Sequence, residues 1–196
     1  MLEAGSTPTL AELRLHNGTI YRWNRPVYDV VDDTPHLRVE NRVLPAGPTV
    51  ADTMANAAFY FGLVRTLAED DRPLWSQMSF SAAEENFHVA AEHGIGARIY
   101  WPGIGEVSAT ELVLRRLLPK AHEGLQLWGV EADEAARLLG IVEQRCVLGR
   151  NGASWYVDRV TALEDHGTDR AEALRVTLQE YRDLMHANEP VHTWPL

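Results

Sequence analysis

Short runs of alternating apolar and polar residues fill the first quarter of the chain. Residues 10–16 alternate, as do residues 19–24, and Asn17 and Gly18 lie between the two runs. An Asn-Gly pair between alternating runs is typical of a two-residue β-hairpin turn, where both turn positions need positive φ. The pattern therefore predicts two paired strands, with Arg25 and Pro26 ending the second of them.

A third alternating run begins at His36, after a polar segment over residues 29–35. It places Arg38, Glu40 and Arg42 on one face and apolar residues such as Leu37 and Val39 on the other. This alternation predicts a half-buried strand whose charged face is open. Prolines and a glycine at residues 45–48 end the strand.

From Thr49 onward the apolar residues recur with the spacing of helices. The pattern predicts six helices, at residues 49–67, 81–94, 108–128, 131–148, 153–165 and 169–187. Thr49 has the composition of an N-cap, Ser81 with Glu84 and Ser108 with Glu111 form capping-box patterns, and Gly149 ends a helix. The prediction is an α+β chain of one domain over residues 1–196, with a small antiparallel sheet of about three strands in residues 1–48, helices in 49–187 and a tail at 188–196.

Composition and charge narrow the classes of function. The formal net charge is −10 and 45% of the residues are hydrophobic, so the chain is predicted to fold, and a nucleic-acid partner is not expected. No apolar run approaches the roughly 20 residues that span a bilayer, and the first residues lack a signal-peptide pattern, so we expect no membrane partner and a cytoplasmic location. The single cysteine, Cys146, falls in a helical pattern and is expected to be a buried, inert thiol.

The sharpest candidate chemistry lies on the third strand. Glu40 between Arg38 and Arg42 is expected to be ionised and to suit Mg²⁺, and the arginines suit phosphate oxygens. The same pattern also fits a solvated strand face crossed by ion pairs. Glu84, His88 and Glu92 share a helix face and are a weaker metal candidate, because the same spacing is common in surface pairing.

Five segments resemble the C-terminal part of the glutamate–cysteine ligase family, in its bacterial branch of ATP-dependent carboxylate–amine ligases. They are LHNGTIYRWNRP (15–26), LRVENRVLPAGPT (37–49), ENFHVAAEHG (85–94), GRNGAS (149–154) and NEPVHTWP (188–195). The resemblance implies a partial glutamine-synthetase-like fold that takes glutamate, cysteine and ATP with Mg²⁺ and makes γ-glutamylcysteine through an acyl-phosphate, a step of glutathione biosynthesis.

The resemblance also implies roles for individual residues. Glu40 corresponds to the family's strand glutamate that binds Mg²⁺, and Arg42 corresponds to the catalytic arginine that contacts the transferred phosphate. Arg22, Trp23, Arg25 and Arg38 are assigned to substrate or phosphate contact. Such roles suit phosphoryl transfer, which depends on positioning and on neutralising charge.

The family's enzymes begin with strands that carry most of their acidic metal ligands, and this sequence starts after them. We therefore expect an incomplete site, inactive alone, that needs the missing N-terminal half or a second copy at the sheet edge. Two alternatives stay open: a non-catalytic binding or interaction module, and a related ligase that uses another amine.

Overall fold

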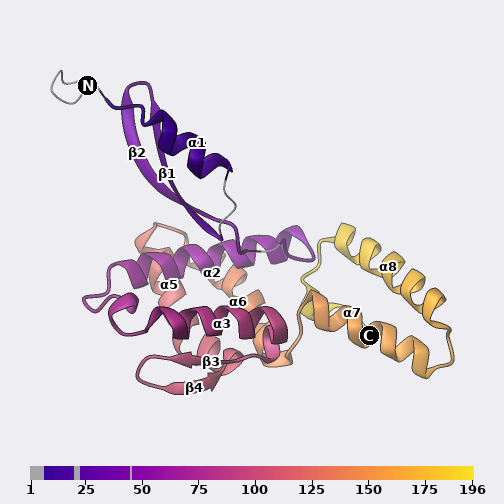
Figure 1. The fold of residues 1–196 in the computed structure, drawn as a ribbon. Coiled ribbons are helices and arrows are strands. Elements are labelled where there is room, and N and C mark those ends of the chain that lie inside the picture. The colour runs from indigo at the N-terminus through magenta and orange to yellow at the C-terminus, as the bar shows by residue number, and fades with distance from the viewer. Residues whose placement is uncertain (1–6, 20–22, 45) are drawn as a thin grey trace. The chain divides into compact units, whose positions relative to one another are not determined.

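The computed structural model describes residues 7–19, 23–44 and 46–196. Its architecture is α+β, as predicted, and contacts within the chain define two compact units, unit 1 (Met1–Pro45) and unit 2 (Ala46–Leu196) (Figure 1). This division does not test the prediction that residues 1–196 form a single domain.

Unit 1 consists of one helix and one hairpin. Its elements are α1 (Ala11–Thr19), β1 (Asn24–Val31) and β2 (Thr34–Asn41). The two strands pair antiparallel along their whole length, from Asn24 opposite Asn41 to Val31 opposite Thr34. Asp32 and Asp33 form the turn at φ 49° and 60°, which is the positive-φ geometry that two-residue hairpins need.

The predicted hairpin at Asn17 and Gly18 is wrong, and so is the three-stranded sheet. Both residues lie in helix α1, because a short run with leucines at positions 10 and 13 also fits helical spacing. Arg25 and Pro26 do not end a strand either, since both lie inside β1. Residues 20–22 of the second predicted strand lie outside the described residues.

Unit 2 is largely helical, with one small hairpin. Its principal elements are α2 (Val50–Ala68), α3 (Phe80–His93), β3 (Arg98–Trp101), β4 (Gly105–Ser108), α4 (Ala109–Leu112), α5 (Leu118–Leu127), α6 (Ala132–Leu148), α7 (Gly152–Asp165) and α8 (Arg170–Ala187). A π-helical turn, η4 (Val113–Leu117), joins α4 to α5, and three short 3₁₀ turns complete the unit: η2 (Leu74–Ser76), η3 (Gly94–Gly96) and η5 (Val191–Thr193).

All six predicted helices are present within a few residues of their expected bounds. Thr49 is the predicted N-cap of α2, and Gly149 ends α6 in the left-handed conformation. Ser108 caps α4 by accepting from the Glu111 N–H, which is one half of the capping box predicted there. The capping box at Ser81 is wrong, because Ser79 accepts the hydrogen bond from the Ala82 N–H and α3 begins at Phe80. The β3–β4 hairpin was not predicted, although residues 98–101 alternate and Gly103 follows them.

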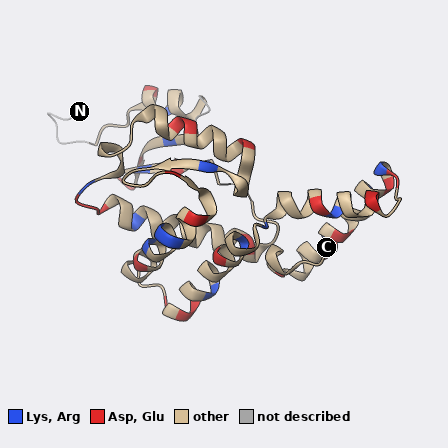
Figure 2. Cartoon of the chain, turned by 90° about the horizontal axis from the view of Figure 1, so that it is seen from below, with Lys and Arg blue, Asp and Glu red and all other residues tan. Residues whose placement is uncertain are grey.

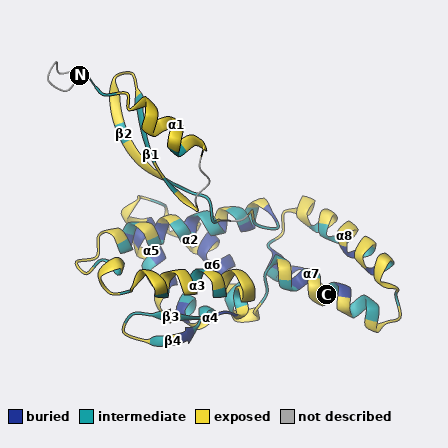
Figure 3. Ribbon diagram, in the orientation of Figure 1, coloured by how far each residue is buried: buried dark blue, intermediate teal, exposed yellow. Residues whose placement is uncertain are grey.

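The core of unit 2 forms where α2 crosses α5 and α6. Small residues allow the α2 and α5 backbones to approach closely: a Cβ added to Gly124 would lie 1.9 Å from the carbonyl oxygen of Gly62. Ala55, Leu125 and Leu139 are among the residues buried around this crossing. Buried residues gather in these helices and at the start of α7 (Figure 3).

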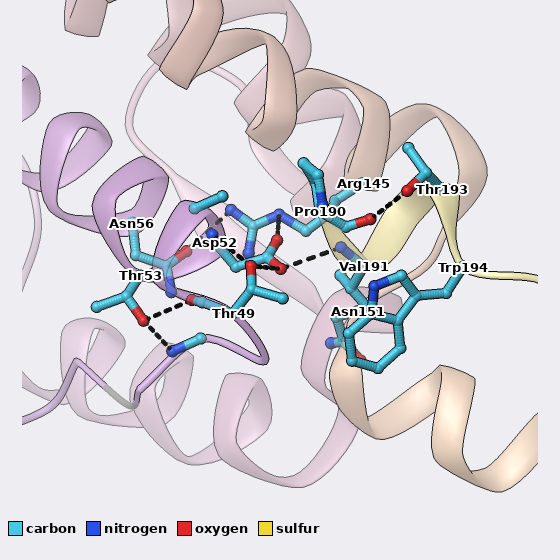
Figure 4. Close-up of polar contacts among 12 residues, drawn as sticks. Thr49, Asp52, Thr53, Asn56, Arg145, Asn151, Pro190, Val191, Thr193 and Trp194 are labelled. Atoms are coloured by element: carbon cyan, nitrogen blue, oxygen red, sulfur yellow. Dashed lines mark hydrogen bonds and ion pairs between the residues drawn. The ribbon is translucent and has the colours of Figure 1, made fainter. Parts of the chain in front are cut away.

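The predicted tail at residues 188–196 is packed rather than loose. The Val191 N–H donates to Asp52 Oδ2 at 3.0 Å, and the Arg150 guanidinium donates to the Trp194 carbonyl at 2.8 Å. Asp52 is fully buried and also accepts from the Thr49 hydroxyl at 2.8 Å (Figure 4). The start of α2 and the last residues of the chain therefore share one polar network.

Acidic and basic side chains are interspersed along the helices (Figure 2). Many form ion pairs, such as Arg159 with both carboxylate oxygens of Glu180 at 2.7 and 2.8 Å. Among the described residues, none of the helices has the length and apolar content needed to cross a membrane.

Candidate functional site

The hairpin of unit 1 brings three of the predicted site residues together. The register places Arg25 of β1 directly opposite Glu40 of β2. One residue beyond the end of β2, the Arg42 N–H donates to the carbonyl of Trp23 at 2.9 Å, which extends the pairing. Arg25, Glu40 and Arg42 therefore lie together at the end of the hairpin remote from its turn.

Glu40 is held between the two arginines. Its Oε2 lies 2.6 Å from Arg25 Nε and 3.2 Å from Arg42 Nη2. Partial desolvation raises the pKa of Glu40, but hydrogen bonds from Arg42 and Arg25 outweigh it, so the pKa is lower than usual. Glu40 is thus ionised at neutral pH, and the cluster of two guanidinium groups and one carboxylate has a net charge of +1.

Arg25 is positioned by both a strand and a helix. Its Nη1 donates to the Asn17 carbonyl of α1 at 3.1 Å, and Asn17 in turn donates to the Pro26 carbonyl at 3.1 Å. These contacts fix the guanidinium against the end of α1 while its Nε faces Glu40. An arginine fixed in this way can orient an anionic ligand without first losing much side-chain entropy.

Arg38 does not join this cluster. Its Nη1 lies 2.5 Å from His36 Nε2 and 3.9 Å from Asp29 Oδ2. Asp29 also pairs with Arg14 of α1 at 2.9 Å. A small cavity of about 210 Å³ between α1 and the hairpin is lined by four charged residues, Arg14, Arg25, Asp29 and Arg38.

The exposed and covered faces of the hairpin are the reverse of the prediction. Helix α1 contacts the charged face, through Arg14 and Asn17. The apolar face is exposed, with Leu37 81% and Val39 66% accessible. The reason is that α1 is the one helix in the described part of unit 1, and its polar residues match the charged side of the sheet.

The structure gives little information on two further predicted site residues, Arg22 and Trp23. Arg22 lies outside the described residues. Trp23 is 55% exposed, and its carbonyl accepts from the backbone of Arg42. Its assignment to substrate contact stays a prediction.

The described residues do not form a complete magnesium site. Mg²⁺ takes six oxygen ligands, commonly one or two carboxylates with substrate phosphates and waters. Glu40 offers one carboxylate, and its Oε2 already bonds two arginines. Within residues 7–19, 23–44 and 46–196, no group of three or more His, Cys, Asp or Glu side chains is placed to hold a metal ion, and this includes the helix face with Glu84, His88 and Glu92.

The sequence pattern missed Arg14 and Asp29, which line the cavity beside Arg38. Asp29 follows Arg25 and Val27 at a spacing of two, so a strand extended through Pro26 would have placed it on the same face. Because proline is tolerated in edge strands, Pro26 did not require the strand to end, and a longer strand would have included Asp29.

Cys146 is partly buried rather than fully buried, and its raised pKa fits the expectation of an inert thiol. Burial raises its pKa, while nearby Arg145 lowers it by less. The thiolate is therefore disfavoured at neutral pH.

Comparison of the chain with protein-family models, with curated proteins and with solved structures finds no match. The basis for a function is thus the Arg25–Glu40–Arg42 cluster, together with the resemblance of the segments that carry it.

Proposed function

We propose that this chain forms part of an ATP-dependent carboxylate–amine ligase of the glutamate–cysteine ligase family. The observation that carries the proposal is the cluster of Arg25, Glu40 and Arg42, because two of its members lie in the most specific segment of the resemblance, residues 37–49. A cytoplasmic location suits an enzyme that uses ATP and amino acids.

The proposed reaction has two steps. A γ-carboxylate oxygen of glutamate attacks the terminal phosphorus of ATP, and ADP leaves. The cysteine nitrogen then attacks the acyl carbon, loses a proton and expels phosphate. Charge moves between phosphate and carboxylate oxygens in both steps, so fixed guanidinium groups lower the barriers by stabilising it.

Arg42 is the proposed contact to the transferred phosphoryl group, and Arg25 is a second contact oriented by α1. Glu40 pairs with both arginines, at 2.6 Å from Arg25 and 3.2 Å from Arg42, and supplies at most one carboxylate to Mg²⁺. The remaining metal ligands and the glutamate pocket are proposed to come from outside these residues.

The hairpin offers surfaces for that completion. A two-stranded sheet has two outer edges, and isolated hairpins are marginally stable in water. Its apolar face, with Leu37 and Val39, is also exposed. We propose that further strands complete a glutamine-synthetase-like sheet here, supplied by an N-terminal half or by a second copy of the chain.

The test is ligase activity in the gene product that carries this sequence, with any residues encoded upstream of it. ADP release should require both glutamate and cysteine. Glu40→Gln and Arg42→Gln should each lower kcat on the order of 10²–10³-fold, as loss of a preorganised charge contact typically does.

The β3–β4 hairpin provides a matched control. Arg98 Nε lies 2.6 Å from Glu106 Oε1, the same distance as in the Arg25–Glu40 pair. Glu106→Gln should therefore leave activity unchanged. If Glu40→Gln retained wild-type rates, Glu40 would be removed from the site.

The same assay separates the alternatives. A non-catalytic binding module would release no ADP under any condition. A related ligase would release ADP with glutamate and an amine other than cysteine. Substantial activity from residues 1–196 alone would refute the proposal that the site is shared.

A further inference from the structure

A basic cavity lies within unit 2. It encloses about 360 Å³ between the end of α2, the segment leading to η2, the β3–β4 turn and the first turn of α5. Its charged residues are Asp70, Arg72, Arg116 and Lys120. Cavities of this size accommodate small organic ligands.

Three cations and one carboxylate line this cavity, in a chain whose formal charge is −10. Asp70 Oδ2 lies 3.4 Å from Lys120 Nζ, and Asp70 Oδ1 accepts the Arg72 N–H at 3.1 Å. That backbone hydrogen bond, followed by the one from Lys120, lowers the pKa of Asp70. Asp70 is therefore ionised at neutral pH, and the four side chains sum to +2.

Two of the cations form no ion pair at contact distance. Among the described residues, no Asp or Glu oxygen lies within 4.0 Å of the guanidinium nitrogens of Arg72 or Arg116, although the charge of Arg72 acts on Asp70 from farther away. Arg115, the neighbour of Arg116, is instead paired with Glu111 at 3.1 Å and lies outside the cavity. Two adjacent arginines thus differ in environment, and the one without a counter-ion lines the cavity.

The helix that carries Arg116 has an unusual local geometry. The π-helical turn η4 contains Arg116 and ends just before Leu118 and Pro119. Proline lacks an N–H and disturbs the regular hydrogen-bond ladder, which accounts for the widened turn. Such π turns occur frequently at functional sites. Arg116 and Lys120 follow at a spacing of four and line the same cavity.

Apolar side chains, including an indole ring, also line the cavity. Trp101, Ile104, Leu74 and Leu67 line the cavity beside the charged residues. Trp101 is half-buried at the end of β3, and its strand is held by pairing to β4. A fixed aromatic ring beside two guanidinium groups suits a ligand with one flat apolar part and one anionic part.

We propose that this cavity binds a small phosphate monoester whose organic part is a flat ring. Guanidinium groups bond phosphate oxygens through their planar fork, and a phosphate monoester carries close to two negative charges at pH 7, which match the net charge of the cavity. A monocarboxylate would neutralise one cation only. The proposal does not depend on the ligase function, because its residues belong to unit 2.

Phenyl phosphate is the probe, titrated into the full chain by isothermal calorimetry at low ionic strength. Phenyl phosphate should bind, phenol should not, and inorganic phosphate should bind more weakly because it lacks the ring. Arg116→Gln and Arg72→Gln should each weaken binding about tenfold or more, as expected for loss of a charge-assisted hydrogen bond.

Two variants guard against indirect effects. Arg115→Gln, the matched control, should bind like the wild type. Asp70→Asn should bind several-fold more tightly, because it releases Lys120 while keeping an oxygen for the Arg72 N–H. A merely disrupted fold would weaken binding instead.

Four results would overturn the proposal: no binding of phenyl phosphate at millimolar concentration, equal binding of phenol, equal weakening by Arg115→Gln and Arg116→Gln, or weaker binding by Asp70→Asn.

Discussion

No side chain is buried in the described part of unit 1, residues 7–19 and 23–44, whereas unit 2 contains three clusters of buried apolar residues (Figure 3). Unit 1 is held by strand pairing and by ion pairs such as Arg25–Glu40 and Arg14–Asp29. Surface ion pairs stabilise a fold by roughly 1 kcal/mol at most, while a buried aromatic side chain contributes several times more. The charged cluster proposed for catalysis thus lies on the unit with the least packing to hold it.

The hairpins of the two units, β1–β2 and β3–β4, also differ in how many of their apolar residues are buried. β3–β4 has four residues in each strand, and its Val107 is buried against Leu112 and Leu117. β1–β2 has eight residues in each strand, with one apolar face open. The longer hairpin is thus the one whose apolar face is exposed, as the proposed addition of further strands would require.

The largest effect should come from the aromatic cluster of unit 2. Trp194 is 1% exposed and packs edge-on against Trp155 and Tyr181, with ring centroids 5.0 and 5.1 Å away. Trp194→Ala should lower the free energy of unfolding by about 3–5 kcal/mol, measured by urea denaturation followed by circular dichroism. Trp75→Ala, at an exposed tryptophan, should change it by less than about 0.5 kcal/mol. Similar losses from both variants would contradict this account of the core.

Smaller changes in the free energy of unfolding, of opposite sign, are expected when alanine replaces two glycines, and they test the helix crossing. Gly124→Ala should destabilise unit 2 by about 1–3 kcal/mol, because the new Cβ would overlap the Gly62 carbonyl. In α6, a Cβ at Gly140 would meet nothing within 4 Å, so Gly140→Ala should stabilise the helix by about 0.5–1 kcal/mol. Thermal unfolding of the two variants checks both signs. Stabilisation by Gly124→Ala would show that the backbones are not in contact.

The smallest effect is the dependence of the stability of unit 1 on pH, through the ionisation of Glu40. The pKa of Glu40 is lowered in the folded chain, so its stabilising contribution is present above the ordinary glutamate pKa and is lost as the pH falls through the lowered value. A ¹³C NMR titration of the Glu40 carboxyl should give a midpoint lower than that of an unstructured glutamate. Arg25→Gln should move this midpoint upward. An unchanged midpoint in that variant would remove Arg25 from the cluster.

The helices could be predicted because their signals are local. Thr49, Ser108 and Gly149 mark their own helix ends, and apolar residues recur at helical spacing between them. The strands were harder to predict, because a short run of alternating apolar and polar residues fits a helix as well as a strand. The turn at Asp32 and Asp33 contains no glycine, whereas the stronger signal at Asn17 and Gly18 lies in a helix.

The candidate site was predicted in part. Periodicity placed Arg38, Glu40 and Arg42 on one face, and the structure brings two of these together with Arg25. The Arg38 contacts with His36 and Asp29 depend on the register of β1 against β2, which one strand alone does not specify. Likewise, the basic cavity of unit 2 draws on segments from Leu67 to Lys120 that only tertiary structure brings together.

The hydrogen bond from the Val191 N–H to Asp52 has a consequence for the order of folding. It joins residues 139 positions apart and therefore closes a long loop, whose entropy must be lost before the contact forms. Local helices can form on much shorter timescales. We therefore expect the buried carboxylate at the start of α2 to receive this partner among the last steps, so that completion of unit 2 waits for the segment around Val191 and Trp194 to arrive.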